Sequence, residues 1–301
     1  MKRPDTFIVG TFKAGTSTMW RELDQHPQVF MSEVKEPMFF GQDLSARYRR
    51  MTEDEYLALF KDARDDQRAG EASPWYLYSS TSAREIKEFS PEARIIVMLR
   101  NPVDVMYSQH SQLVYNLRED LTDFADALAA EDDRAAGKRI PADALRPEAL
   151  LYRRSVRFPE QVSRYLDRFG RERVHFIVFE DLAGDPAGVY RSALQFLEVD
   201  PSFEIDHRVE NANRTPRSRM VQRLVFAPPK PLRSMYGRLR TMPVMHRVRD
   251  RIARSNVEGV KRQPMDAQLR RELTAEFAPQ VEELGKLIGR DLSAWSGSGS
   301  A

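Results

Sequence analysis

The sequence contains no cysteine, which excludes disulfide bonds, zinc–thiolate sites and thiol chemistry. It also lacks any apolar run that approaches the length of a membrane-spanning helix, about 18 residues or more. We also expect no secretory leader, because Met1–Pro4 leads straight into the first apolar run. From these absences we expect a cytoplasmic protein.

Histidine is scarce, and its five copies form no recognisable catalytic or metal-binding pattern. They are His26, His110, His175, His207 and His246. None stands at metal-ligand spacing from an acidic residue or a second histidine. The sequence also shows no Ser-His-Asp arrangement and no G-x-G-x-x-G fingerprint of dinucleotide binding. We therefore expect no metal.

Positive charge gathers in one segment, although the formal net charge of the chain is only +2. Residues 214–262 hold 14 lysines and arginines against two acidic residues, a local charge of +12. A segment of this kind is typical of one that meets an anion. Apolar residues interleave with the arginines over 224–262, which suits an amphipathic helix at a membrane surface. A solvated or packed helical cover explains the same pattern, so both interpretations stay open.

The chain opens with a strand, a loop between two glycines and a helix. The apolar run Phe7–Val9 ends at Gly10, and apolar residues at helical spacing predict a helix over Thr16–Asp24. Unpaired N–H groups and the helix dipole make such a helix start a site for a phosphate or a sulfate. The predicted anion cradle consists of Lys13, Ala14, Gly15, Thr16, Ser17 and Thr18.

The spacing of this loop argues against a nucleotide triphosphatase. A P-loop reads G-x-x-x-x-G-K-[ST], with the lysine beside the hydroxyl residue that holds Mg²⁺. Gly10 and Gly15 have the required separation, but Thr16 follows Gly15 and Lys13 lies inside the loop.

A second motif begins with a buried strand. Ile95–Leu99 is a continuous apolar run, as expected for a parallel strand covered on both faces. Arg100 follows at its carboxyl end, where open α/β sheets bind ligands. Pro102 suits the first turn of a helix, and Ser108 lies two turns further along. A guanidinium in this place offers several donors to phosphate oxygens.

The two motifs together resemble those of sulfotransferases that use 3′-phosphoadenosine-5′-phosphosulfate (PAPS). Phe12–Thr18 is similar to the family's 5′-phosphosulfate loop, and Arg94–Ser108 is similar to its 3′-phosphate motif. The resemblance implies a P-loop-like, three-layer α/β fold with a central parallel sheet flanked by helices. It implies that Arg100 and Ser108 grip the 3′-phosphate. It also implies that a basic loop closes over the phosphates, with Arg214 and Arg217 as its candidates.

A third segment suggests the catalytic base. Lys35–Phe40 resembles the K-E-P-x-F-F element of the branch that includes heparan sulfate sulfotransferases, in which the glutamate is the proposed base. Glu36 matches that glutamate, with simple pairing to Lys35 as the alternative interpretation. His110 is the second candidate, since it lies two residues beyond Ser108. Gly70–Leu77 is similar to another segment of this branch, but Ala72 replaces a lysine that assists the reaction there.

We expect one domain over residues 1–295. It carries a helical lid insert over 117–147 and the basic segment 214–262, and a flexible tail or added remnant follows over 296–301. Other helices are predicted over 52–66, 80–89 and 158–169, and further helices start at Asp185 and close the chain over 264–295. The run 174–182 is predicted to be a strand that passes into a loop.

The resemblance implies in-line transfer of a sulfuryl group from PAPS to a hydroxyl or an amine, with release of 3′,5′-ADP. Glu36 would deprotonate the acceptor, and Lys13 would stabilise the charge on the bridging oxygen. The expected acceptor is a glycan, a glycolipid or another small natural product. Nucleic acid is not expected as a partner, whereas peripheral membrane contact is expected through 224–262. A P-loop kinase and a non-catalytic anion- or membrane-binding module are the alternatives.

Overall fold

The short apolar runs of the sequence form one parallel sheet. The structure is a computed structural model that describes residues 2–45, 49–207, 215–216, 257–258 and 263–297. The strands are β1 (Thr6–Gly10), β2 (Val29–Met31), β3 (Arg68–Ala72), β4 (Arg94–Leu99) and β5 (Val174–Val178). They lie in the order β2-β3-β1-β4-β5, and every pair is parallel. All five residues of β1 are buried, which explains why its sequence is apolar rather than alternating.

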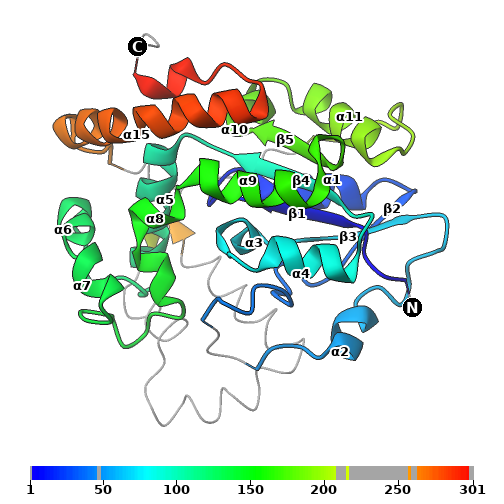
Figure 1. The fold of residues 1–301 in the computed structure, drawn as a ribbon, viewed down its shortest axis with the longest axis horizontal. Coiled ribbons are helices and arrows are strands. Elements are labelled where there is room, and N and C mark those ends of the chain that lie inside the picture. Colours follow the sequence, from blue (N-terminus) through cyan, green and yellow to red (C-terminus); the bar gives the residue numbers. More distant parts are fainter. Residues whose placement is uncertain (1, 46–48, 208–214, 217–256, 259–262, 298–301) are drawn as a thin grey trace.

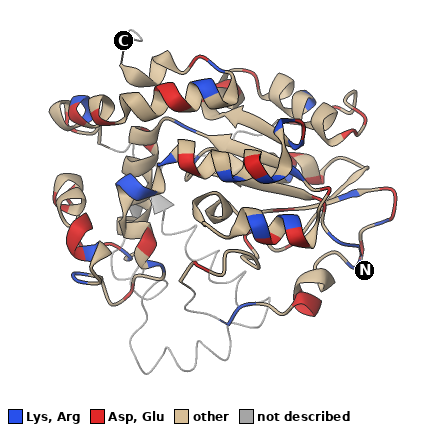
Figure 2. Ribbon diagram, viewed as in Figure 1, with Lys and Arg blue, Asp and Glu red and all other residues tan. Residues whose placement is uncertain are grey.

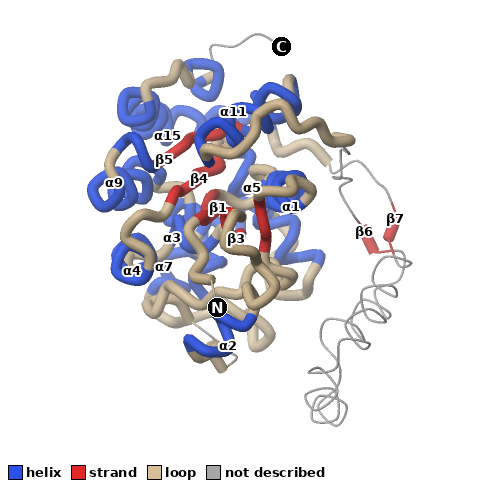
Figure 3. Tube along the Cα trace, turned by 90° about the vertical axis from the view of Figure 1, so that its right-hand side faces the viewer, coloured by secondary structure: helices blue, strands red, loops and turns tan. Residues whose placement is uncertain are grey.

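Alternate residues of the central strands point to two separate helical layers. Phe7, Val9 and Val97 contribute to a core with α4 (Ser82–Phe89), α9 (Phe158–Phe169) and α15 (Ala267–Ile288). Ile8, Ile96 and Met98 pack on the opposite face with α1 (Thr16–Asp24) and α11 (Pro186–Leu197). Figures 1 and 3 show the helices on both sides of the sheet. The predicted α/β architecture with a flanked parallel sheet is confirmed.

The remaining helices are shorter and join these layers. They are α2 (Glu53–Ala58), α3 (Trp75–Tyr78), α5 (Pro102–Tyr115), α6 (Phe124–Ala129), α7 (Glu131–Ala135), α8 (Tyr152–Ser155) and α10 (Phe179–Gly184), with 3₁₀ turns at Pro147–Leu150, Arg171–Arg173 and Ser293–Ser296. Lysines and arginines alternate with acidic residues along the outer faces of α4 and α9, whereas most of the sheet is uncharged (Figure 2). The charges therefore lie on the solvent side of the helical layers.

The local signals that predicted helix starts act as expected. Pro102 begins α5, and the side chain of Asn101 accepts hydrogen bonds from the N–H groups of Val103 and Asp104. Asp185 caps α11 by accepting from the N–H of Gly188. The helices predicted over 16–24 and 158–169 are confirmed with those bounds.

Two expected elements differ from the structure. The acidic stretch 52–66 is helical only over Glu53–Ala58, because the chain then tightens into turns that bury Phe60 completely. The stretch after β5 was expected to be a loop, but Phe179–Gly184 forms α10. This helix places the buried Leu182 in the same core as Met98.

The basic segment lies almost entirely outside the described residues. Only Thr215–Pro216 and Val257–Glu258 are described, and they pair antiparallel as β6 and β7. Arg214 and Arg217 lie outside the described part as well. Within the described ranges, no helix combines the length and the apolar character needed to cross a bilayer.

The insert over 117–147 carries α6 and α7, and it contains a buried ion pair that a tyrosine of α8 contacts. The guanidinium of Arg134 donates to both carboxylate oxygens of Glu119, at 2.6 and 2.7 Å, and neither side chain is exposed. The hydroxyl of Tyr152 on α8 donates to the same carboxylate at 2.6 Å. The insert is therefore a packed part of the domain, and its function as a lid stays a prediction.

Replacing Arg134 by methionine should destabilise the protein by about 3–5 kcal/mol, because the buried carboxylate of Glu119 then loses its charged partner. Urea denaturation measures this change. Arg84→Met is the matched control, since Arg84 forms an exposed pair with Glu88 on α4 and should cost about 0.3–0.5 kcal/mol. Equal losses in the two variants would contradict the structural role of the buried pair.

Candidate functional site

The loop that follows β1 is fixed by the close approach of neighbouring chain segments. The N–H of Thr11 donates to the carbonyl oxygen of Met98 on β4 at 2.9 Å. Gly15 has a left-handed backbone with φ of 91°, and a Cβ atom there would lie 2.5 Å from Cδ2 of Leu182. A side chain at this position would be both strained and obstructed. The loop conformation therefore requires glycine before α1.

The start of α1 leaves donors for a ligand. No side chain caps this helix, and its first residue Thr16 lies next to Ser17 at the mouth of the loop. The first N–H groups of a helix have no partner inside the helix, and the helix dipole favours an anion beside them. This end of α1 has the donors expected of the predicted cradle.

Arg100 meets the loop from the end of β4. Its Nη1 donates to the carbonyl oxygen of Lys13 at 3.1 Å, and its guanidinium lies 4.3 Å from the centre of the Phe179 ring. Its Nε atom is buried and has no hydrogen-bond partner among the described residues. Lys13 itself has a left-handed backbone with φ of 59°. The structure thus brings Lys13 and Arg100 together although 87 positions separate them in sequence.

A cavity of about 270 Å³ joins the loop to the third predicted segment. It is lined by Thr11, Phe12, Lys13, Gly15, Thr16, Ser17, Lys35, Glu36, Pro74, Trp75 and Gln112. Lys13 and Glu36, the two residues to which the sequence assigned the chemistry, therefore line one cavity. Ser108 lies one helical turn before Gln112 on α5 and is nearly buried, which places it on the same side of that helix.

Glu36 is held in an unusual backbone conformation and forms an ion pair. The φ angle of Glu36 is 58°, and that of Met38 is 54°. The N–H of Glu36 donates to the carbonyl oxygen of Ala72 at 3.1 Å. Nζ of Lys35 donates to Oε1 of Glu36 at 2.7 Å, while 43% of the Glu36 side chain stays exposed. Non-glycine residues in this region cost about 1–3 kcal/mol each and cluster at functional sites. The Lys35 pair that the sequence left as an alternative is thus present at the cavity itself.

His110 lies elsewhere. It is not among the residues that line the cavity. Its Nε2 lies 2.9 Å from the carbonyl oxygen of Leu121, and its ring packs against Phe124 and Tyr152. Burial lowers the pKa of His110 below its ordinary value. The geometry therefore places His110 beside the insert.

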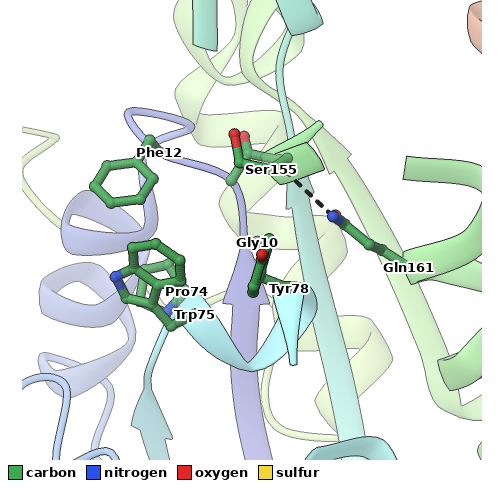
Figure 4. Close-up of a pocket in the computed structure, with 8 residues that line it drawn as sticks. Gly10, Phe12, Pro74, Trp75, Tyr78, Ser155 and Gln161 are labelled. Atoms are coloured by element: carbon green, nitrogen blue, oxygen red, sulfur yellow. Dashed lines mark hydrogen bonds between the residues drawn. The ribbon is translucent and has the colours of Figure 1, made fainter. Parts of the chain in front are cut away.

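A second, much smaller cavity lies behind the loop. It has a volume of about 20 Å³ and is lined by Gly10, Thr11, Phe12, Pro74, Trp75, Tyr78, Ser155 and Gln161 (Figure 4). The rings of Phe12 and Trp75 meet edge to face, with their centres 5.1 Å apart. Oγ1 of Thr11 is buried without a hydrogen-bond partner in the described part of the chain. The volume suits a single water molecule rather than a substrate.

A buried carboxylate lies under the Glu36 loop. Glu71 is completely buried on β3 and accepts hydrogen bonds from the hydroxyls of Tyr56, Ser73 and Tyr76 at 2.6–3.0 Å. Burial, opposed by these three hydrogen bonds, raises the pKa of Glu71 to about 7. The charge of Glu36 adds to the rise.

Sequence reasoning did not select Glu71, Trp75 or Gln112 for the site. Glu71 carries a signal that could have been used, since it is the one acidic residue of a short strand that is otherwise small and apolar after Arg68. Trp75 and Gln112 carry no such signal, because only the packing of α3 and α5 brings them to the cavity. Across the described ranges, no group of three or more His, Asp or Glu side chains could hold a metal ion.

Comparison with known proteins agrees with this geometry. The family model described as "Sulfotransferase domain" matches residues 3–285. A solved sulfotransferase from Alicyclobacillus acidocaldarius is 33% identical, covers 98% of this chain and 99% of its own, and superposes with a TM-score of 0.72. This likeness confirms the predicted P-loop-like α/β fold.

Curated relatives match over a shorter part. The heparan sulfate glucosamine 3-O-sulfotransferase 6 of Mus musculus is 32% identical over 111 residues, which is 36% of this chain and 30% of that protein. The membrane-associated sulfotransferase kil1 of Dictyostelium discoideum is 27% identical over 107 residues, which is 36% of this chain and 22% of that protein. The matched region thus spans under a third of each of these two relatives.

The raised pKa of Glu71 predicts a pH-dependent stability. Between its ordinary value of 4.5 and about 7 the folded protein binds the proton more tightly than the unfolded chain, so stability falls as the pH rises through this window. The loss in the free energy of unfolding should reach about 3 kcal/mol and stay constant at pH values above this window. Denaturant unfolding of the wild type and Glu71→Gln between pH 4.5 and 8 isolates this contribution, because the variant lacks it. If the stability of the wild type and that of Glu71→Gln changed in parallel with pH, the raised pKa of Glu71 would be contradicted.

Proposed function

Because the chain belongs to the sulfotransferase family, we propose that it transfers a sulfuryl group from PAPS to a hydroxyl or an amine and releases 3′,5′-ADP. The observation that carries this proposal is the single cavity of about 270 Å³ that Lys13, Glu36 and the start of α1 line together. We propose a glycan, a glycolipid or another small natural product as the acceptor. The proposed domain covers residues 1–295.

The residues around the loop suit the donor. The N–H groups at the start of α1 and the hydroxyls of Thr16, Ser17 and Thr18 would hold the 5′-phosphate, and Gly15 together with Ala14 keeps the loop close to it. The buried Nε of Arg100 has no partner within the described residues, so this guanidinium has donor capacity left for the 3′-phosphate. Ser108 would add a hydroxyl to the same phosphate. Arg214 and Arg217 stay proposed contacts outside the described residues.

The reaction follows from the two groups that line the cavity. Glu36 accepts the proton of the acceptor as its oxygen or nitrogen attacks sulfur. The bond between sulfur and the bridging oxygen of the phosphate breaks, and its electron pair stays on the departing 3′,5′-ADP. The ammonium of Lys13 stabilises the charge that grows on this oxygen, an interaction that is stronger in the transition state than in the ground state.

Lys35 shares the Glu36 carboxylate in the absence of an acceptor. One carboxylate oxygen accepts from Nζ of Lys35, and nearly half of the Glu36 side chain stays open to the cavity and solvent. The ion pair therefore agrees with a catalytic Glu36, and it does not reduce Glu36 to a structural residue.

The alternatives explain less of the geometry. His110 was the second candidate base, but it lies outside the cavity and against Leu121, so the proposal assigns proton transfer to Glu36. A P-loop kinase would carry its lysine directly after Gly15, where Thr16 begins α1. A non-catalytic binding module does not explain why a strained Glu36 lines the same cavity as Lys13. For the segment 224–262, contact with an anionic acceptor or membrane surface stays the proposal.

Removal of the Arg100 guanidinium should weaken nucleotide binding selectively. Arg100→Ala should lose about 1.5–3 kcal/mol more affinity for 3′,5′-ADP than for 5′-AMP, the scale of a charged hydrogen bond. Isothermal titration calorimetry with both nucleotides measures the difference. A wild type that binds 3′,5′-ADP and 5′-AMP equally would exclude a 3′-phosphate site.

Removal of the proposed base should slow the chemistry and spare the donor site. Glu36→Gln should lower turnover with PAPS by about 10²–10⁴-fold and leave PAPS affinity nearly unchanged, because the amide keeps the shape of the side chain but cannot take a proton. Glu33→Gln is the matched control, since Glu33 is exposed on the same loop and does not line the cavity. Wild-type turnover in Glu36→Gln would exclude Glu36 as the base.

A further inference from the structure

The segment that carries Glu36 needs support from outside, because its own backbone is strained. Glu36 and Met38 both have positive φ angles, and Pro37 between them has no N–H group to donate. Toward β3, the N–H of Glu36 donates to the carbonyl oxygen of Ala72. Strained backbone of this kind persists only where the surrounding structure fixes it. The other end of the segment must therefore be held as well.

The hydroxyl of Tyr76 supplies that second support. It accepts hydrogen bonds from the N–H groups of both Phe39 and Phe40, at 2.9 and 3.3 Å. Tyr76 lies on α3 and is completely buried. One buried oxygen thus satisfies two consecutive backbone donors directly after the strained residues.

Glu71 determines the direction of this hydroxyl. The Tyr76 hydroxyl donates to Oε1 of Glu71, with 3.0 Å between the two oxygens, which leaves its lone pairs to face Phe39 and Phe40. Ser73 donates to the other carboxylate oxygen of Glu71 at 2.6 Å, and the side chain is closed off from solvent. A hydroxyl can both donate and accept, so a fixed acceptor on one side makes it an acceptor on the other.

We propose that Tyr76, oriented by Glu71, is a positioning residue that holds the Glu36 carboxylate in its place at the cavity. This inference rests on the proposed function, in which Glu36 takes the proton of the acceptor. The chain of contacts runs from the buried carboxylate through one hydroxyl to the backbone three and four residues after Glu36. Tyr76 touches neither the proposed donor site nor the cavity.

Tyr56 offers a matched control for this series of contacts. Tyr56 on α2 is also completely buried, and its hydroxyl donates to the same Oε1 of Glu71 at 2.7 Å. Its ring stacks on Phe39 with the centres 4.3 Å apart, a contact that phenylalanine would keep. Tyr56→Phe and Tyr76→Phe therefore each remove one donor from Glu71. Only Tyr76→Phe also removes the acceptor of the loop.

The test compares the two variants by two independent measurements. In Tyr76→Phe, amide hydrogen exchange at Phe39 and Phe40 should be about tenfold faster than in the wild type, whereas Tyr56→Phe should leave it unchanged. Steady-state kinetics with PAPS should show kcat lower by about 10–100-fold in Tyr76→Phe, with KM for PAPS unchanged, because a misplaced base slows chemistry without weakening the donor. Glu71→Gln is the second variant: it keeps the Tyr76 hydroxyl but replaces one of the two carboxylate acceptors by an amide donor, so exchange at Phe39 and Phe40 should again be faster than in the wild type.

The outcomes separate this inference from the proposed function. Equal kcat losses in Tyr56→Phe and Tyr76→Phe, or unchanged exchange at Phe39 and Phe40 in Tyr76→Phe, would overturn the positioning role. If the wild type turns over PAPS and Tyr76→Phe has the same kcat, the positioning role would be overturned as well, and the proposed function would stay intact. Wild type without PAPS turnover would overturn the proposed function, and hydrogen exchange in the apo protein would still decide whether Tyr76 holds the segment.

Discussion

The close approach of β1 and β4 at the carboxyl edge of the sheet is the constraint on which the site depends. A Cβ atom at Gly10 would lie 2.4 Å from the carbonyl oxygen of Met98, so only glycine lets the two strands end side by side. Gly15 then turns the chain into α1 with a left-handed backbone, and Leu182 leaves no room for a side chain at this position. The anion cradle and Arg100 meet here because parallel strands end at the same edge.

Strain collects around this edge and is offset by contacts from other segments. Lys13, Glu36 and Met38 have left-handed backbones, although none of them is glycine. Arg100 donates to the carbonyl oxygen of Lys13, and Tyr76 accepts from the backbone that follows Met38. Each strained residue thus belongs to a segment that a side chain from another element holds. This arrangement keeps charged groups in fixed directions around a cavity that a substrate can enter.

Buried carboxylates connect the periphery of the domain to its centre. Glu119, paired with Arg134 inside the insert, joins the insert to α8 through Tyr152, and Glu71 joins α2 and α3 to the Glu36 segment through two tyrosines. The two differ in their partners. Glu119 faces a guanidinium, whereas Glu71 faces hydroxyls alone and has its pKa raised to about 7. Glu71 therefore titrates near neutrality inside the support of the site.

The sequence by itself determined the sheet strands around the site, most helices and the family. Local signals are sufficient for these features: continuous apolar runs for β1 and β4, Pro102 and Asp185 at helix starts, and a loop in which Lys13 precedes Gly15. Such signals depend on neighbours within a few positions, so they can be read along the chain.

Only the tertiary structure decided which residues share the cavity and which support it. The contacts between Arg100 and Lys13 and between Tyr76 and Phe39 join segments 37–87 positions apart, and no spacing rule relates them. His110 shows the same limit, since two residues beyond Ser108 on a helix means the opposite side, toward the insert. The start of α10 at Phe179 likewise follows from the core position of Leu182 rather than from its own sequence. Long-range packing therefore decides between local conformations and positions that the sequence signals alone do not distinguish.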